Sequence, residues 1–444
     1  MLDKTRCQEI FAEVLKHSRA DETELHIGGG LHHLTRFANN TIHQNVSEEG
    51  FHFTVRTVFG QRTACASTNR SDPESLRRAV EESSSLARQQ QPDDELVSMP
   101  GPQDYTPVER RFASTEAITP QDRAAAVLQA IRIAEKNGQT AAGTFSTGMG
   151  LASILNSNGL FAYYVETDSE FSITLMASDS SGWAKNTTPD VREINAEALA
   201  LKASGIALRS RSPHELAPGH YTAILEPAAV LDLVGFMFYD FSGQAVRDQR
   251  SFLNNRIGKK IFGDNITITD DAYHSLQFGA PFDGEGLRRQ RLVMVENGVA
   301  KSLTYSRQTA KTLGVEPTGH GFPVPNEYGE APMNIVISGG SQSLDDMIAS
   351  TDRGILVTRF WYIREVDHYR KILTGMTRDG TFLVENGKVQ HGIRNFRFNQ
   401  SLIDMLSSVQ ILGIPERSSG EESFPMVVPA MKVSSFHFSE VTKF

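Results

Sequence analysis

The chain has 444 residues, of which 39% are hydrophobic and 22% charged, with a formal net charge of −9. This length predicts two or three domains. Its two cysteines, Cys7 and Cys65, exclude a disulfide scaffold and a cysteine-rich zinc module, and they favour a reduced, cytoplasmic setting. The acidic charge argues against nucleic-acid binding. No apolar run reaches the roughly 18 residues of a membrane span, so no membrane association is expected.

The first half of the chain combines capped helices with period-two strands. Apolar residues at helical spacing, Cys7, Ile10, Phe11 and Val14, predict a first helix behind an Asp3 cap. Alternation over residues 24–68 predicts an antiparallel meander. Its expected turns are 28–30, 39–40, 48–50 and 60–61. Capped helices are then expected after Asp72 and Thr119, strands over 141–183 with a turn at Asn158-Gly159, and a helix over 194–203.

A domain boundary is expected at Arg209–Pro213, which divides the chain into residues 1–212 and 213–444. A strand over 221–225 leads into a helix that starts at Glu226-Pro227, and this helix is apolar on nearly every side, so it should be buried. Further strands are expected at 266–270, 292–295, 333–338, 355–362, 381–384 and 427–438, and helices at 306–313, 344–350 and 400–412. The fold class predicted is α+β, with an amino-terminal antiparallel sheet flanked by helices and a carboxy-terminal β-rich domain that contains a buried helix.

Histidines give weak metal-site candidates. His214 and His220 are six residues apart, whereas two ligands on one helical face need a spacing of four, and Pro218-Gly219 would break a helix between them. Five more histidines, His26, His32, His33, His43 and His52, fall on expected strands with turns between them. Ordinary strand histidines are the simpler interpretation. Cys7 and Cys65 are interpreted as core thiols.

Two segments are candidates for peptide binding. Around Phe360-Trp361-Tyr362-Ile363-Arg364, alternation would place Phe360, Tyr362 and Arg364 on one face and Arg359, Trp361 and Ile363 on the other. Sheet core with a surface ion pair is the competing interpretation. The loop Thr318–Pro323 lacks the strand-to-helix context of a phosphate site, and its His320 is kept as a further candidate. The peptide-binding candidates are His320, Arg359, Trp361, Tyr362 and Arg364.

Several segments in the right order resemble the TldD/TldE (PmbA) family, once labelled modulators of DNA gyrase. They are Thr35–Val46, Ala66–Asn69, Pro218–Val230, Phe282–Gly286 and Thr374–Val389. In this family, TldD-type chains carry His-Glu-x-x-x-His on the helix after the first strand of the second domain, together with a carboxy-terminal Cys, and bind a catalytic metal. TldE-type chains lack these ligands and pair with a TldD-type chain to form a metalloprotease.

The family pattern falls on Pro227–Asp232 of this chain. Pro227 and Asp232 stand at the two histidine positions and Ala228 at the glutamate position, while Glu416–Gly420 occupies the region of the missing cysteine. Proline and alanine cannot bind zinc. The resemblance therefore implies a TldE-type chain with no catalytic residue and no metal of its own.

The implied partner is a zinc-containing TldD-type subunit in a heterodimer, or a second copy in a homodimer, with a peptide as substrate. Two alternatives stay open. One is a homo-oligomeric peptide-binding scaffold without a protease partner. The other is a metallopeptidase with unconventional ligands drawn from His214, His220 or the histidines of the first domain.

Overall fold

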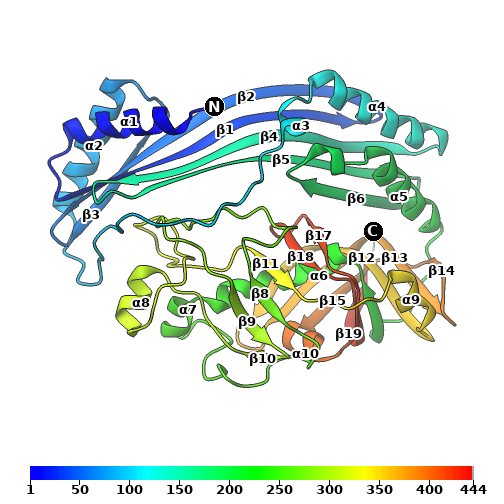
Figure 1. Cartoon of the computed structure of the whole chain (residues 1–444). Helices are drawn as coiled ribbons and strands as arrows, with labels where there is room; N and C mark the ends of the chain where they lie inside the picture. Colours follow the sequence, from blue (N-terminus) through cyan, green and yellow to red (C-terminus); the bar gives the residue numbers. More distant parts are fainter. Residues whose placement is uncertain (443–444) are drawn as a thin grey trace.

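The computed structural model of the chain describes residues 1–442. Its amino-terminal half is built on a six-stranded antiparallel sheet in the order β3-β2-β1-β4-β5-β6, which arches over the carboxy-terminal half (Figure 1). The strands are β1 (Glu22–Ala38), β2 (Thr41–Phe59), β3 (Arg62–Thr68), β4 (Thr140–Asn156), β5 (Phe161–Met176) and β6 (Ser181–Thr188).

The turns expected at residues 28–30 and 48–50 are wrong, because both segments lie inside long strands. Gly30 pairs with Gly50 of β2 and with Gly150 of β4. A Cβ atom on Gly30 would lie 1.9 Å from the Met149 carbonyl oxygen, and Gly29 has a φ of 126°. The glycines are therefore needed for the close approach of neighbouring backbones, not for chain reversal.

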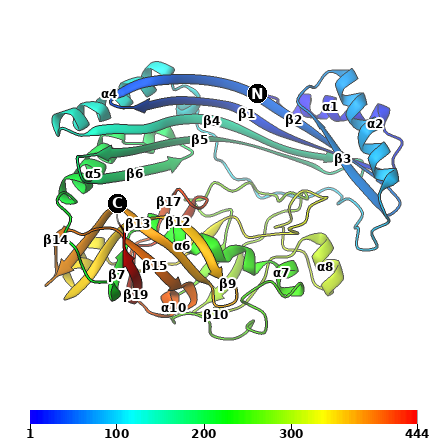
Figure 2. The same cartoon turned by 180° about the vertical axis from the view of Figure 1, so that it is seen from behind.

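Helices cover the outer face of this sheet, and their caps agree with the prediction. They are α1 (Lys4–His17), α2 (Pro73–Gln89), α3 (Ala113–Glu116), α4 (Pro120–Lys136), α5 (Ala196–Arg209) and the 3₁₀ turn η1 (Val191–Glu193). The side chains of Asp3, Asp72 and Thr119 each accept a hydrogen bond from the first turn of α1, α2 and α4. The inner face of the sheet is turned toward the carboxy-terminal half (Figure 2).

The carboxy-terminal half contains a closed barrel and a smaller sheet. The barrel order is β12-β7-β19-β15-β13, closed by pairing of β12 with β13, and β14 and β16 are attached to it. The second sheet runs β10-β9-β8-β11-β18-β17. The strand bounds are β7 (Gly219–Leu225), β8 (Ile268–Asp270), β9 (Leu292–Glu296), β10 (Val299–Ala300), β11 (Ile335–Ile337), β12 (Arg353–Asp367), β13 (Ile372–Glu385), β14 (Lys388–Gly392), β15 (Phe396–Ser401), β16 (Val409–Leu412), β17 (Glu416–Ser418), β18 (Met426–Val428) and β19 (Met431–Val441).

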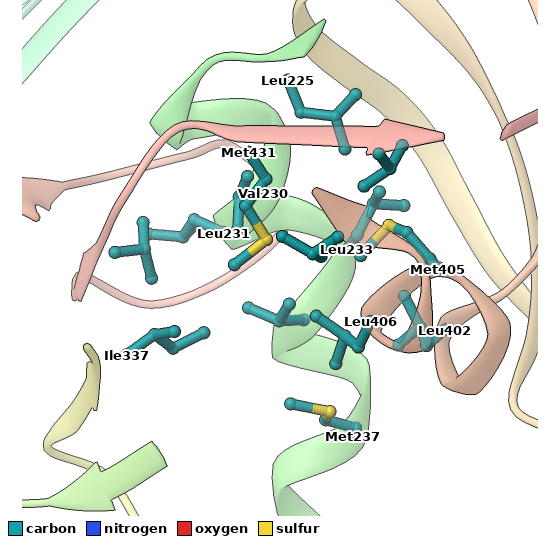
Figure 3. Packing of buried hydrophobic residues seen from close by; sticks show 14 of the residues in the cluster. Leu225, Val230, Leu231, Leu233, Met237, Ile337, Leu402, Met405, Leu406 and Met431 are labelled. Carbon is teal, nitrogen blue, oxygen red and sulfur yellow. The ribbon is translucent and has the colours of Figure 1, made fainter. Parts of the chain in front are cut away.

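The buried helix predicted after β7 is α6 (Pro227–Val234), which continues into the 3₁₀ segment η2 (Gly235–Phe241). Leu231, Leu233 and Met237 have no exposed surface, and Leu233 points toward Met405 and Leu406 of α10 (Leu402–Ser407), whereas Leu231 points to the opposite side of the helix (Figure 3). The other helices are α7 (Gly243–Arg247), α8 (Arg307–Leu313) and α9 (Leu344–Ala349). These elements confirm the α+β class with a β-rich carboxy-terminal half.

Two expectations near the end of the chain need correction. The helix expected over 400–412 ends at Ser407, and Val409–Leu412 pairs with β19 as a strand. The strand expected over 427–438 is interrupted after Val428, and its two parts belong to different sheets. No helix within residues 1–442 is long and apolar enough to cross a membrane.

Candidate functional site

The helix α6 carries the positions that the resemblance aligns with the family's metal site, with Pro227 and Ala228 at its start and Asp232 in its second half. Glu226 precedes it, and Pro227 takes the first helical position, where its missing N–H costs nothing. Pro227 and Ala228 are half-buried, and neither side chain carries a donor atom. Asp232 is fully buried and is the remaining polar side chain at these positions.

Asp232 faces the loop after β17. Its Oδ1 accepts a hydrogen bond from the Glu422 N–H at 3.2 Å, while Oδ2 is buried and has no hydrogen-bond partner among the described residues. A Cβ on Gly420 would lie 2.0 Å from Oδ1, so only glycine lets the loop pass this closely. Burial raises the pKa of Asp232 to about 7, against the lowering effects of the Glu422 N–H and of Arg359.

Arg359 of β12 is buried next to this helix, between two tryptophans. Its guanidinium lies 4.7 Å from the ring centroid of Trp183 and 5.3 Å from that of Trp361. Its Nε donates to Asp379 Oδ2 at 2.7 Å, and Nη2 also contacts that carboxylate. The buried Nη1 has no acceptor within residues 1–442. Since Ser181 of β6 also donates to Asp379, this cluster joins the two halves of the chain.

The loop over Ser419–Glu422 connects Asp232 with the other predicted peptide-binding residues of β12. Glu422 accepts a hydrogen bond from the Tyr362 N–H at 2.7 Å and lies 3.8 Å from Arg364 Nη1. Lys185 of β6 donates to the Gly420 carbonyl at 3.2 Å, and Thr187 donates to Ser419 at 2.8 Å. Tyr362 and Arg364 therefore both contact this loop, although both are largely exposed, whereas Arg359 and Trp361 contact each other next to Asp379.

The alternation expected for this stretch of β12 is wrong. Tyr362 has a φ of 58°, and the pairing with β13 shifts between Trp361 and Arg364. This bulge turns both Phe360 and Ile363 into the barrel core, and it leaves Tyr362 exposed. Sequence reasoning missed the bulge because no glycine marks it.

His320 lies in a different environment from the other candidates. Its side chain is fully buried, with Nε2 3.2 Å from Asp270 Oδ1 and Nδ1 2.9 Å from the Thr318 hydroxyl. Burial alone would raise the pKa of Asp270, but the interaction with the adjacent His320 holds that pKa at about 2. These contacts bring His320 to Asp270 and not to the loop around Glu422.

The remaining histidines are dispersed. His214 stacks on His391 with ring centroids 4.0 Å apart, whereas His220 stacks on His437 at 4.6 Å. In the amino-terminal half, His26 contacts Glu24 at 3.0 Å. The described residues 1–442 contain no group of three or more histidine, cysteine, aspartate or glutamate side chains arranged to hold a metal ion.

The residues at the start of α6 do not fit a catalytic zinc site. Such a site needs three protein ligands, and the side chains that replace them offer one carboxylate, whose raised pKa favours its neutral form. Cys7 lies on the buried face of α1, and Cys65 lies on β3 with its thiol 3.6 Å from the Val324 carbonyl. None of these contacts brings either thiol to Asp232.

Several residues of this site escaped sequence reasoning. Trp183, Lys185, Asp379 and Glu422 come from four separate segments, which only the fold brings together. One signal was available, because Trp183 and Trp361 are the only two tryptophans of the chain.

Comparison with known proteins gives concordant results over most of the chain. Three family descriptions match: PmbA/TldA metallopeptidase domain 1 at residues 29–87, the central domain at 113–211 and the C-terminal domain at 218–440. An uncharacterized protein of Methanocaldococcus jannaschii is 31% identical over 221 residues, 48% of this chain and 51% of that protein, so the chain spans about half of its length. The metalloprotease PmbA of Escherichia coli O157:H7 is 24% identical over 85% of this chain and 84% of that protein.

A solved structure has the same fold. TldE from Thermococcus kodakarensis superposes with a TM-score of 0.89 at 21% identity, covering 97% of this chain and 99% of that chain. The family descriptions together with this shared fold lead to one conclusion. The chain belongs to the PmbA/TldD metallopeptidase family.

Proposed function

We propose that this chain is the non-catalytic, TldE-type subunit of a TldD/TldE-type metallopeptidase, in which a TldD-type partner supplies the zinc. The observation that carries the proposal is the start of α6, where Pro227 and Ala228 offer no donor atom and Asp232 is turned to the Glu422 N–H. No general base to activate water stands at the Ala228 position. The subunit would then contribute surface and stability to a peptide cavity, not bond cleavage.

The residues around the loop Ser419–Glu422 are candidates for contact with an extended peptide. Tyr362 is 59% exposed, and the guanidinium of Arg364 lies 5.0 Å from its ring centroid. An aromatic ring with an adjacent cation suits both apolar side chains and carbonyl oxygens of a peptide. Arg359 and Trp361 would act indirectly, by fixing the position of β12, and would not contact the peptide themselves.

The test is reconstitution of purified subunits. We expect the chain alone to hold well under one equivalent of zinc and to cleave no unfolded peptide, and the mixture with a TldD-type partner to bind zinc and cleave. Metal content would be measured by mass spectrometry for each subunit, and assembly by light scattering. Stoichiometric zinc with cleavage by the chain alone would overturn the proposal. A stable homo-oligomer that binds peptide and ignores the partner would favour the scaffold alternative.

Two substitutions test the remaining alternative, a metallopeptidase with unconventional ligands. His214→Ala and His220→Ala remove exposed side chains whose neighbours are His391 and His437. If the chain alone binds metal and both variants lose it, a ligand set outside α6 is present. If neither variant changes the metal content, these two histidines are not ligands.

A further inference from the structure

A cleft of about 810 Å³ lies at the junction of the two halves, and Asp379 and Ser181 of the Arg359 cluster are part of its lining. The amino-terminal half contributes residues of the β5–β6 turn and of the segment after α5, over 174–181 and 210–213. The carboxy-terminal half contributes residues of β13 and of the segment before β15, over 378–381 and 393–395. A ligand in this cleft would therefore touch both halves at once.

Hydrogen-bond donors dominate the lining. Arg378 and Arg394 are 48% and 45% exposed, and their nearest carboxylates, Asp379 and Glu215, lie at 3.7 and 3.5 Å, longer than a close ion pair. Asn395 accepts two threonine hydroxyl hydrogen bonds through Oδ1, and its amide nitrogen makes no hydrogen bond within the described chain. Ser210 has a buried hydroxyl without a partner among residues 1–442. Unused donors of this kind call for acceptors.

The carboxylates of the lining are already engaged. Asp379 is held by Arg359 and by the Ser181 hydroxyl. Asp179 accepts the Ser212 N–H at 2.8 Å. Only Asp379 is neutralised by an arginine, whereas Asp179 keeps its charge, so the two arginines leave the lining net positive although the whole chain carries a net charge of −9. Local charge opposite to the overall charge is typical of a site that selects its ligand electrostatically.

The other lining residues restrict the rest of the ligand. Met176, Pro213 and Ile393 provide apolar surface, and no residue that lines the cleft within the described chain is aromatic. A nucleobase would find no ring on which to stack, whereas an aliphatic body would find apolar contacts. The volume is in the range of pockets for small molecules.

We propose that this cleft is a binding site for a small, non-aromatic oxyanion, a carboxylate or phosphate compound, held by Arg378 and Arg394. Planar guanidinium groups pair with two oxygens of either anion, and the Asn395 amide and serine hydroxyls supply further donors. The proposal does not rest on the proposed TldE-type role, because it uses residues of this chain alone, although Asp379 and Ser181 of the lining also belong to the Arg359 cluster.

The experiment is titration of the purified full chain with inorganic phosphate and, separately, with succinate, by calorimetry at constant ionic strength with chloride as the reference anion. We expect binding of at least one of the two above the chloride background, and the stronger of the two identifies the ligand class. Arg378→Gln and Arg394→Gln should each weaken that binding about 10-fold, as the loss of one charge-assisted hydrogen-bond pair implies.

Arg397→Gln is the matched control, because Arg397 is a 51% exposed arginine of β15 that does not line the cleft. Its affinity should stay within about twofold of the unaltered chain, as an exposed charge outside the site contributes little. Near-ultraviolet circular dichroism shows whether each variant is folded. Arg394→Gln is the second test if Arg378→Gln, which lies against Trp361, disturbs the fold. No binding above chloride, or equal weakening in Arg397→Gln, would overturn the proposal.

Discussion

Substitution of Asp232 by asparagine should stabilise the chain at alkaline pH and leave its stability nearly unchanged at acidic pH. Asparagine keeps the shape of the side chain and an oxygen that can accept the Glu422 N–H, but it cannot ionise. The Oδ2 atom it replaces is buried without a partner among the described residues, so no hydrogen bond is lost there. The difference between the two side chains is therefore mainly the charge.

The magnitude follows from the raised pKa. Burial shifts the pKa of Asp232 from 3.8 in the unfolded chain to about 7 in the folded chain. At a pH below 4 both states are protonated, so the carboxyl group costs nothing. Between pH 4 and 7 the unfolded state ionises and the folded state does not, so the free energy of unfolding falls by about 1.4 kcal/mol per pH unit. Above pH 7 the loss is complete at about 4 kcal/mol.

Urea unfolding at pH 4, 6 and 8 gives the free energies that are needed. The two tryptophans lie 4.7 and 5.3 Å from the Arg359 guanidinium, so their fluorescence reports on this part of the molecule. We expect the advantage of Asp232→Asn over the unaltered chain to grow by about 4 kcal/mol from pH 4 to pH 8. The increase of this stability difference with pH, and not its value at one pH, measures the cost of the buried charge.

Asp232→Ala is the control for the hydrogen bond. It removes the same titration, so its pH dependence should match that of Asp232→Asn. It also removes the acceptor of the Glu422 N–H, which should lower its stability at every pH by about 1–3 kcal/mol relative to the asparagine variant. A constant difference between Asp232→Asn and the unaltered chain from pH 4 to 8 would refute the assignment of a neutral buried carboxyl.

Three further outcomes are expected. Gly30→Ala should destabilise the amino-terminal sheet by several kcal/mol, roughly 3 or more, since its Cβ would lie 1.9 Å from the Met149 carbonyl, whereas Gly50→Ala meets no atom within 4 Å and should be nearly neutral in thermal unfolding. Arg359→Met should cost about 3–5 kcal/mol in urea unfolding by leaving Asp379 buried without its cation, and the double variant with Asp379→Asn should recover part of that loss. A metal chelator should leave the melting temperature of the purified chain unchanged, and a fall of several degrees would reveal a structural metal.

Local elements could be predicted from the sequence where one signal decided them. The caps at Asp3, Asp72 and Thr119 and the apolar spacing behind them are signals that lie within the residues of each helix or directly before it. The buried helix α6 was likewise visible, because an apolar surface on every side requires burial.

Errors arose where a distant segment determined the local structure. Gly28–Gly30 had the composition of a turn, but the neighbouring strands β2 and β4 extend past it and use the glycines for close contact. At Tyr362 the bulge depends on the pairing partner in β13, which local alternation does not include. Val409–Leu412 continues the helical pattern of the preceding residues in the sequence, but in the structure it pairs with β19 as a strand.

The candidate site was predictable as a set of positions but not as a set of contacts. The resemblance located Pro227, Ala228 and Asp232, and composition alone singled out Arg359–Arg364. The hydrogen-bond partners of these residues, Asp379 and Glu422, are separated from them by 20 to 190 positions, and no local pattern marks them. Their role depends on where β6 meets the barrel.

The same junction determines how the two parts of the molecule influence each other. The Arg359 guanidinium contacts Trp183 of the amino-terminal half and Trp361 of the carboxy-terminal half. Its partner Asp379 accepts a hydrogen bond from Ser181 across the junction. Asp379 also lines the cleft with Arg378 and Arg394, and Arg359 is among the charges that act on Asp232. Charges close to the buried Asp379–Arg359 pair are poorly screened by solvent. An anion in the cleft would therefore repel the Asp379 carboxylate and make its ion pair with Arg359 more important for its stability. If the cleft binds an anion as proposed, that binding would therefore be coupled to the ionisation of Asp232 through the Arg359–Asp379 ion pair.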